Sequence, residues 1–194
     1  GIEPLMTDMW GIDVVVSASQ KGLMCPPGLS FVTLSSNAWA CVQPSKGYSY
    51  WDFQKLRDNA QKLTTPNTPP FSIISALNEA LSMIRSEGLL SVWKRHMRIA
   101  LACRAGICAV NLDLFAASCP AVALTSVKVH EGIIPSLLQG VLRDRYGILI
   151  ATGQDELASE IFRIGHLGAI AEIDMVAFLS ALERALADLG ERIR

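Results

Sequence analysis

The spacing of apolar residues in the first third of the chain predicts two strands joined by a tight reversal. Residues 12–17 (IDVVVS) form a short, continuous apolar run, which is typical of a strand covered on both faces. Residues 29–34 (LSFVTL) predict a second strand, and the sequence PPG at 26–28 supplies the reversal between the two. Residues 48–63 mix aromatic and charged side chains, so we expect irregular chain and a short helix there.

The middle of the chain predicts two long helices. The stretch TTPNTPP at 64–70 interrupts regular structure, and Thr68 followed by Pro69 is a natural N-cap with proline at the first helical position. The first helix carries apolar residues at steps of three and four, and Gly88 ends it. Its stripe is Phe71, Ile74, Leu77, Leu81 and Ile84, and the second helix follows through Leu90, Trp93, Met97, Leu101 and Arg104.

After residue 110 the pattern predicts strands and helices in the order β-β-α-β-β-α. This order indicates a compact α+β lobe behind the two long helices, whereas the first 45 residues are typical of the edge of a different, larger sheet. The last helix has its predicted apolar stripe at Ile173, Val176, Leu179, Leu182, Leu186 and Leu189. The predicted elements are strands at 112–116 and 121–129, a helix at 134–146 that leads to Gly147, strands within ILIATG and EIFRIG, and a helix at 173–189.

Composition excludes several classes of protein. The 194 residues include 17 basic and 18 acidic side chains, a net charge of −1, which argues against a nucleic-acid-binding scaffold. Hydrophobic residues make up 51%, as in a globular protein. Two nearly uncharged segments, 22–45 and 105–127, are interrupted by turn residues, so we expect buried strands and no membrane span, and no export signal is visible.

The five cysteines and three histidines predict neither a zinc site nor a disulfide framework. The cysteines are an odd, scattered set without a CxxC pair, and the histidines lie far apart in sequence, so we expect reduced thiols in the cytoplasm and no bound metal. The chain opens with Gly1 and reaches a predicted strand within thirteen residues, so we expect it to be the later part of a longer protein. The cysteines are Cys25, Cys41, Cys103, Cys108 and Cys119.

Lys21 has an unusual setting, between the first predicted strand and a long uncharged run. A loop lysine is most simply a solvated surface residue, since buried unpaired lysines are rare. The other interpretation is a covalent anchor, because a lysine removed from water favours the free amine, and a free amine forms a Schiff base with an aldehyde. Ser17, Ser19 and Gln20 would place neutral hydrogen-bond donors beside that amine, which suits an anionic group.

Several segments together resemble the class V aminotransferases, the fold-type I group that holds the alanine–glyoxylate and serine–glyoxylate enzymes. The segment SASQKGLMCPPGLSF resembles the lysine segment of this family, and the other three occur in the family's order and spacing. The resemblance spans nearly the whole chain and implies dependence on pyridoxal 5'-phosphate. The segments are PLMTDMWGIDVVVSASQKGLMCPPGLSF, TPNTPPFSIISALNEAL, VWKRHMRIALACRAGI and FRIGHLG.

The resemblance implies a role for five residues. Lys21 matches the lysine that forms the Schiff base and moves the substrate's Cα proton, and Gln20 matches a residue that contacts the cofactor phosphate. Thr68 lies in the segment that reaches the phosphate of the neighbouring subunit, which implies a homodimer with shared sites; the alternative is a pure helix cap, although a cap and a phosphate contact are compatible. Thr65 stands where relatives often have a tyrosine of similar role. Arg163 matches the arginine that grips the substrate α-carboxylate, a task that suits a guanidinium fork.

Structural interpretations stay open beside these roles. Taken alone, Arg163 would be a strand arginine in a surface ion pair, although its apolar neighbours indicate a strand end near a cleft. We expect His166 to be structural, Trp93 to lie in the core, and Arg95 and His96 to be solvated. Three further parts of the family's site are not expected in these residues, because in the family they precede the segment that corresponds to Gly1. They are the aspartate that pairs with the pyridine nitrogen, the group that stacks on the ring and the Gly/Ser-rich segment that binds the phosphate.

The sequence thus predicts the C-terminal part of an α/β pyridoxal-phosphate-dependent transferase fold. The expected parts are the end of the large cofactor-binding domain at 1–63, connecting helices at 64–110 and a small α+β domain at 111–194. The expected activity moves an amino group from a small amino acid, alanine or serine, to a 2-oxo acid, glyoxylate or pyruvate. The alternatives are a catalytically incomplete lobe that only dimerises, or a related lyase or desulfurase.

Overall fold

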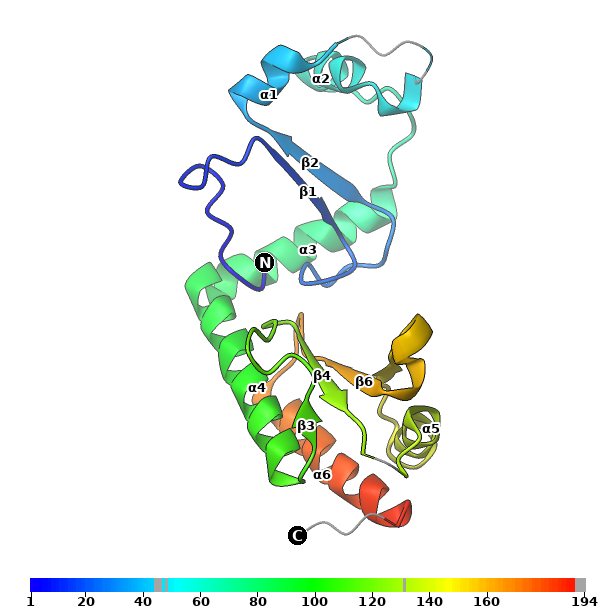
Figure 1. Ribbon diagram of the computed structural model, residues 1–194. Coiled ribbons are helices and arrows are strands. Elements are labelled where there is room, and N and C mark those ends of the chain that lie inside the picture. Colours follow the sequence, from blue (N-terminus) through cyan, green and yellow to red (C-terminus); the bar gives the residue numbers. More distant parts are fainter. Residues whose placement is uncertain (44–46, 48, 131, 191–194) are drawn as a thin grey trace. The chain divides into compact units, whose positions relative to one another are not determined.

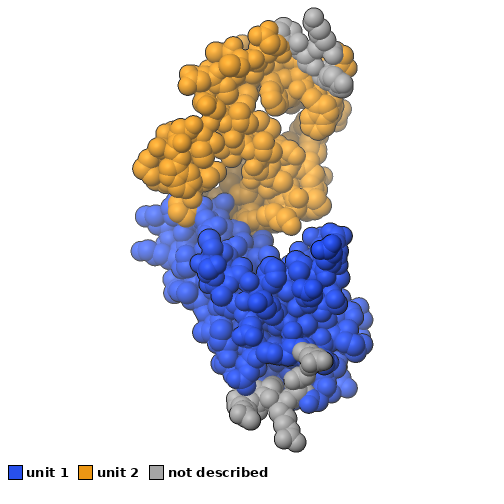
Figure 2. Space-filling model, in the orientation of Figure 1, with its two compact units in different colours: residues 1–3, 87–194 blue, residues 4–86 orange. Residues whose placement is uncertain are grey.

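The computed structural model describes residues 1–43, 47, 49–130 and 132–190. The chain divides into two compact units, Pro4–Ser86 and Gly1–Glu3 together with Glu87–Arg194 (Figures 1 and 2). The structure thus divides the chain once in the middle, and the three predicted parts with boundaries at residues 63 and 110 stay a prediction.

The unit Pro4–Ser86 is built on one antiparallel hairpin, β1 (Val14–Ala18) and β2 (Ser30–Leu34), with Ala18 opposite Ser30. A short helix α1 (Ser36–Cys41), which the sequence pattern did not predict, follows at once; the Ser35 hydroxyl caps it by accepting from the Ala38 N–H. The rest is helical: η1 (Ser49–Trp51), α2 (Phe53–Gln61) and α3 (Phe71–Glu87). This agrees with the short helix predicted for residues 48–63, of which Tyr48 lies outside the described residues.

Two predictions for this unit are wrong in detail. The strand predicted to be covered on both faces leaves Val14 and Val16 50% and 70% exposed, because α1 and Phe53 of α2 line this face of the described sheet without covering it. The helix α3 begins at Phe71, beyond the predicted start at Pro69. A residue that precedes a proline is kept out of the helical region, and Pro69 is followed by Pro70, so Thr68 is not the cap.

The second unit has the predicted order of strands and helices. Its four-stranded sheet has the order β3-β4-β6-β5 with all neighbours antiparallel, and the helices α4, α5 and α6 supply most of the packing around it (Figure 1). Gly147 ends α5 in the left-handed conformation expected of a C-cap glycine. The elements are α4 (Leu89–Ala109), β3 (Asp113–Leu114), β4 (Leu124–Lys128), α5 (Pro135–Tyr146), β5 (Ala151–Thr152), η2 (Asp155–Ser159), β6 (Ile161–Gly165) and α6 (Glu172–Asp188).

The core of this unit lies between the sheet and the three helices. Phe162 and Ile164 of β6 are buried in it together with Val127 of β4, and full burial of a side chain such as Phe162 contributes about 1.5–3 kcal/mol. Since side chains alternate across a strand, Arg163, between the two buried residues, lies on the opposite face of the sheet. The helices contribute Ile99, Cys103 and Ile107 from α4, Leu138 and Leu142 from α5, and Phe178, Leu182 and Leu186 from α6.

The faces predicted for α4 and α6 are partly wrong. Leu90 and Leu101 of the predicted α4 stripe are 67% and 56% exposed, and Ile173 and Val176 of α6 are 70% and 60% exposed. Each helix has apolar residues on more than one face, and periodicity alone does not say which face meets the sheet. The buried residues of α4 are Val92, His96, Ile99, Ala100, Cys103 and Ile107, and those of α6 are Met175, Phe178, Ala181, Leu182, Ala185 and Leu186.

Candidate functional site

The loop between β1 and β2 is held together by Ser19. This residue is fully buried, and its hydroxyl donates to the Pro26 carbonyl at 2.7 Å while it accepts from the Leu29 N–H at 3.3 Å. The Ser19 backbone also bonds to Leu29 and to Cys25, both at 3.1 Å. The expected role of the Ser19 hydroxyl as a donor to a bound anion is therefore wrong, because the loop itself uses that hydroxyl.

Lys21 lies in a turn of this loop. The Lys21 carbonyl accepts from the Met24 N–H at 2.9 Å, and Met24 has a φ of 60°, a left-handed conformation that is uncommon for a residue with a side chain. The Lys21 side chain is exposed, so the removal from water expected for a reactive amine is not provided within the described chain. The turn therefore fixes the backbone at Lys21 and leaves its amine accessible.

The Lys21 loop packs against the beginning of α3. Gly28 has a φ of 141°, and a Cβ at this position would lie 2.3 Å from the Cδ1 of Ile73, in the first turn of α3. Thr65 and Thr68 lie in the exposed chain just before that turn, and Gln20 is exposed beside Lys21. The four residues predicted to contact the cofactor therefore belong to one unit, whereas Arg163 belongs to the other.

Arg163 is half-buried on β6, between β4 and β5. Its Nε donates to the Thr152 carbonyl at 2.9 Å, and its strand partner on β4 is Ser126. Among the residues that the structure describes, no carboxylate pairs with Arg163, and the four ion pairs found there involve other arginines. The surface ion pair considered for Arg163 is thus not formed within the described chain, and its two terminal nitrogens are available for an anion.

His166 is a buried structural residue, as expected. It is fully buried, and its Nε2 lies 2.8 Å from the Thr125 Oγ1 on the neighbouring strand β4. Burial lowers the pKa of the His166 imidazole below its ordinary value of 6.5, which keeps the ring neutral at pH 7. The pair joins the end of β6 to β4.

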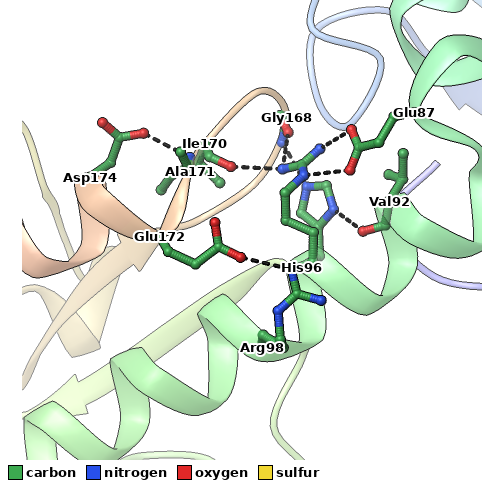
Figure 3. A network of polar contacts seen from close by, with 10 residues as sticks. Glu87, Val92, His96, Arg98, Gly168, Ile170, Ala171, Glu172 and Asp174 are labelled. Carbon is green, nitrogen blue, oxygen red and sulfur yellow. Dashed lines mark hydrogen bonds and ion pairs between the residues drawn. The ribbon is translucent and has the colours of Figure 1, made fainter.

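Arg95 and His96 were expected to be solvated, and that prediction is wrong. His96 is 1% exposed and the Arg95 side chain 16% exposed, and both bond to the segment 166–171 that follows β6 (Figure 3). A signal for His96 exists in the sequence, because it stands four residues after Val92 and three before Ile99, both of which are buried. We know of no pattern in the sequence that would have found Arg95.

The described ranges hold neither a metal-binding cluster nor a helix that could span a membrane. No group of three or more His, Cys, Asp or Glu side chains there could hold a metal ion. No described helix combines the length and the apolar character needed to cross a bilayer.

A family profile and several curated relatives match the chain. The family profile described as aminotransferase class-V matches residues 2–165. Over 185 residues the chain is 45% identical to the small subunit of a soluble hydrogenase from Synechococcus sp. (strain PCC 6716), covering 94% of this chain and 48% of that protein. It is also 33% identical over 191 residues to an L-aspartate–glyoxylate aminotransferase from Paracoccus denitrificans, covering 94% of this chain and 47% of that protein.

A solved structure with the same fold covers nearly the whole chain. The crystal structure of pyridoxamine-pyruvate aminotransferase from Mesorhizobium loti matches with a TM-score of 0.90 and 31% identity, covering 99% of this chain and 51% of that one. This likeness confirms the α/β fold class and the partial fold expected from the sequence. The chain spans about half the length of the curated relatives it matches.

Proposed function

The chain belongs to the class V aminotransferase family, and on this premise we propose that it provides the cofactor lysine and the substrate-binding arginine of a pyridoxal-phosphate-dependent transaminase. The proposed anchor is Lys21, and the proposed carboxylate clamp is Arg163. The observation that carries the proposal is the state of Arg163, a half-buried guanidinium without a carboxylate partner in the described chain.

An arginine in this state is able to bind an anion from outside the described chain. Partial burial costs hydration, and the one neutral hydrogen bond from Nε to Thr152 does not compensate the charge. The remaining two nitrogens form the fork that binds both oxygens of a carboxylate through parallel hydrogen bonds. An α-amino acid or a 2-oxo acid supplies such a carboxylate.

The residues around Lys21 fit the cofactor. Pyridoxal 5'-phosphate, when bound, supplies an aldehyde and an electron-withdrawing ring. The Lys21 amine is accessible, stands on a turn fixed by Ser19, and has no acidic partner among the ion pairs of the described residues. It would hold the cofactor's aldehyde carbon and then move a proton to and from the substrate Cα.

The phosphate of the cofactor would be bound by neutral donors. Gln20 is exposed beside Lys21, and Thr68 and Thr65 are exposed in the segment before α3. Thr68 is not required as the helix cap, so its hydroxyl is available for a phosphate oxygen. In our proposal Thr68 serves the phosphate of a partner subunit, which makes the active form a homodimer.

The substrates in our proposal are small. We propose alanine or serine as amino donor and glyoxylate or pyruvate as acceptor; the names of relatives, an L-aspartate–glyoxylate and a serine–glyoxylate aminotransferase among them, support an oxo acid of this size. All five cysteines are free, which accords with the proposed cytoplasmic location.

Amino transfer in the full-length gene product tests this function. Purified protein with pyridoxal phosphate should convert alanine or serine in the presence of glyoxylate or pyruvate, and Lys21→Ala should remove the activity while the protein stays folded. A dimer that binds no cofactor would instead support the dimerising lobe. Release of sulfide from cysteine without amino transfer would support a desulfurase.

A further inference from the structure

The segment 166–171, which joins β6 to α6, is bound by a single arginine of α4. The Arg95 Nη1 donates to the carbonyl oxygens of Gly168 and Ile170, at 3.1 and 2.7 Å (Figure 3). The other side of the same guanidinium makes a bidentate pair with Glu87, at 2.7 and 2.9 Å. Each of the three nitrogens of the Arg95 guanidinium therefore donates to a protein oxygen.

His96, the residue after Arg95, binds the same segment through the backbone N–H of Gly168. Its Nδ1 lies 2.8 Å from the Val92 carbonyl, which can only accept, so Nδ1 carries the proton. The free lone pair on Nε2 then accepts the Gly168 N–H at 3.1 Å. The N–H and the carbonyl of Gly168 are thus both bound by adjacent residues of α4.

Gly168 is suited to this double contact. It is buried, and its φ of 87° lies in the left-handed region that favours glycine. Hydrogen bonding to Arg95 lowers the pKa of the Glu87 carboxyl, so the pair stays charged well below neutral pH. Arg95 and His96 thus bind the segment 166–171 directly, and Glu87 binds Arg95; we call this set of contacts the clasp.

The clasp follows the end of β6, where the strand that carries Arg163 is no longer paired with β5. The last pair between β5 and β6 is Ala151 with Arg163, so among the described strands Ile164 and Gly165 have a neighbour only on the β4 side. The acceptor for Arg163 Nε, Thr152, also belongs to the short strand β5. The residues after Arg163 are consequently held by β4 and by the clasp.

We infer that Arg95 is a positioning residue for the substrate carboxylate site. With Glu87 and His96 it fixes the segment after β6, and so fixes the direction in which the Arg163 guanidinium is presented. Arg95 touches no substrate in this account. The inference rests on the proposed function, because it gives Arg163 the role of clamp.

The test compares Arg95→Gln with Arg98→Gln in the full-length gene product. Arg98 is on the same helix and pairs with Glu172, at the start of α6, at 2.7 Å, but both side chains are more than half exposed and neither bonds to the segment 166–171. Arg95→Gln should release the segment 166–171, and the poorer placement of the Arg163 guanidinium should raise KM for amino donor and oxo acid by about tenfold each. It should also weaken the protection of the Gly168 amide against hydrogen exchange, measured without substrate or cofactor, because the segment is then held only through the bond of this amide to His96.

The expected split between KM and kcat separates positioning from stability. A merely structural Arg95 would lower the melting temperature and the active fraction, hence kcat, but leave both KM values unchanged, and that result would overturn the inference. Arg98→Gln should change neither KM nor the Gly168 exchange. Lack of amino transfer by the wild-type protein would refute the proposed function instead. That outcome is distinct from any difference between the variants and the wild type.

A milder variant covers the case in which Arg95→Gln does not fold. Glu87→Gln leaves the two carbonyl contacts of Arg95 in place but removes the charge that orients its guanidinium. It should raise both KM values by about threefold, less than the rise of about tenfold expected for Arg95→Gln. Unchanged KM values in a folded Glu87→Gln protein would overturn the inference.

Discussion

Replacement of Arg163 by lysine keeps the positive charge but removes the planar guanidinium, which can donate two parallel hydrogen bonds to a carboxylate. Within the part of the chain that the structure describes, the side chain makes one hydrogen bond, from Nε to the Thr152 carbonyl at 2.9 Å, and the strand pairing of β6 does not involve the side chain. The loss of one such bond costs about 0.5–1.5 kcal/mol of unfolding free energy. For a chain of this size that is a fall in melting temperature of roughly 1–6 °C.

The effect on substrate should be much larger than the effect on stability. A carboxylate bound through two parallel hydrogen bonds keeps only one with an ammonium group, and a charge-assisted bond is worth about 1.5–3 kcal/mol. Both KM values should therefore rise roughly ten- to a hundredfold. Poorer placement of the Cα–H bond should also lower kcat. The cofactor absorbance should not change, because Arg163 is assigned to substrate.

The assay measures both KM values, the cofactor spectrum and the melting temperature of Arg163→Lys in the full-length gene product. Arg104→Lys is the matched control, because Arg104 also makes one hydrogen bond to a carbonyl, that of Ala121 at 3.3 Å, and has no assigned substrate. Unchanged KM values for both substrates in Arg163→Lys would refute the reasoning. So would an equal rise in Arg104→Lys.

Three further predictions concern the cofactor, a thiol and a histidine. Thr68→Val should weaken retention of pyridoxal phosphate, measured by dialysis and absorbance, more than it lowers the melting temperature; equal retention would leave Thr68 without a role. Burial raises the pKa of Cys103 to about 11, so a thiol reagent at pH 8 should label the exposed Cys119 and spare Cys103 in the folded chain, and rapid labelling of Cys103 would contradict its burial. The unfolded chain protonates His166 near its ordinary value of 6.5, whereas burial lowers the pKa in the folded chain, so stability is lost as pH falls below 6.5, by at most about 1.4 kcal/mol per pH unit. Denaturant titrations at pH 7 and 5 should show a smaller loss of unfolding free energy in His166→Gln than in the wild type. Identical losses in the two proteins would show that His166 does not cause the pH dependence.

The order of elements could be predicted because local signals decide it. Gly88 and Gly147 both adopt positive φ, at 84° and 66°, and each marks a helix boundary that the sequence places correctly. The β-β-α-β-β-α order of the second unit follows from apolar runs between such breaks. The short helix after β2 was missed because Ser35 and Ser36 are equally typical of a turn, and only the hydrogen bond from the Ala38 N–H distinguishes a cap.

The positions of polar groups could not be predicted in the same way. The setting of Lys21 in the sequence drew attention to it, and resemblance to a family gave Lys21 and Arg163 their roles. The structure adds that Lys21 is accessible and that Arg163 lacks a carboxylate partner in the described chain. Ser19 and Arg95 bind backbone groups that are distant in sequence, and the partner of such a side chain is set by tertiary packing. Periodicity carries no information about that packing.

Reduction with borohydride tests the central claim most directly. The full-length gene product is incubated with pyridoxal phosphate, reduced and digested, and the modified peptide is identified by mass spectrometry. The account predicts one pyridoxyl group, on Lys21. A pyridoxyl group on another lysine, or none on Lys21 in a protein that transfers amino groups, would contradict it.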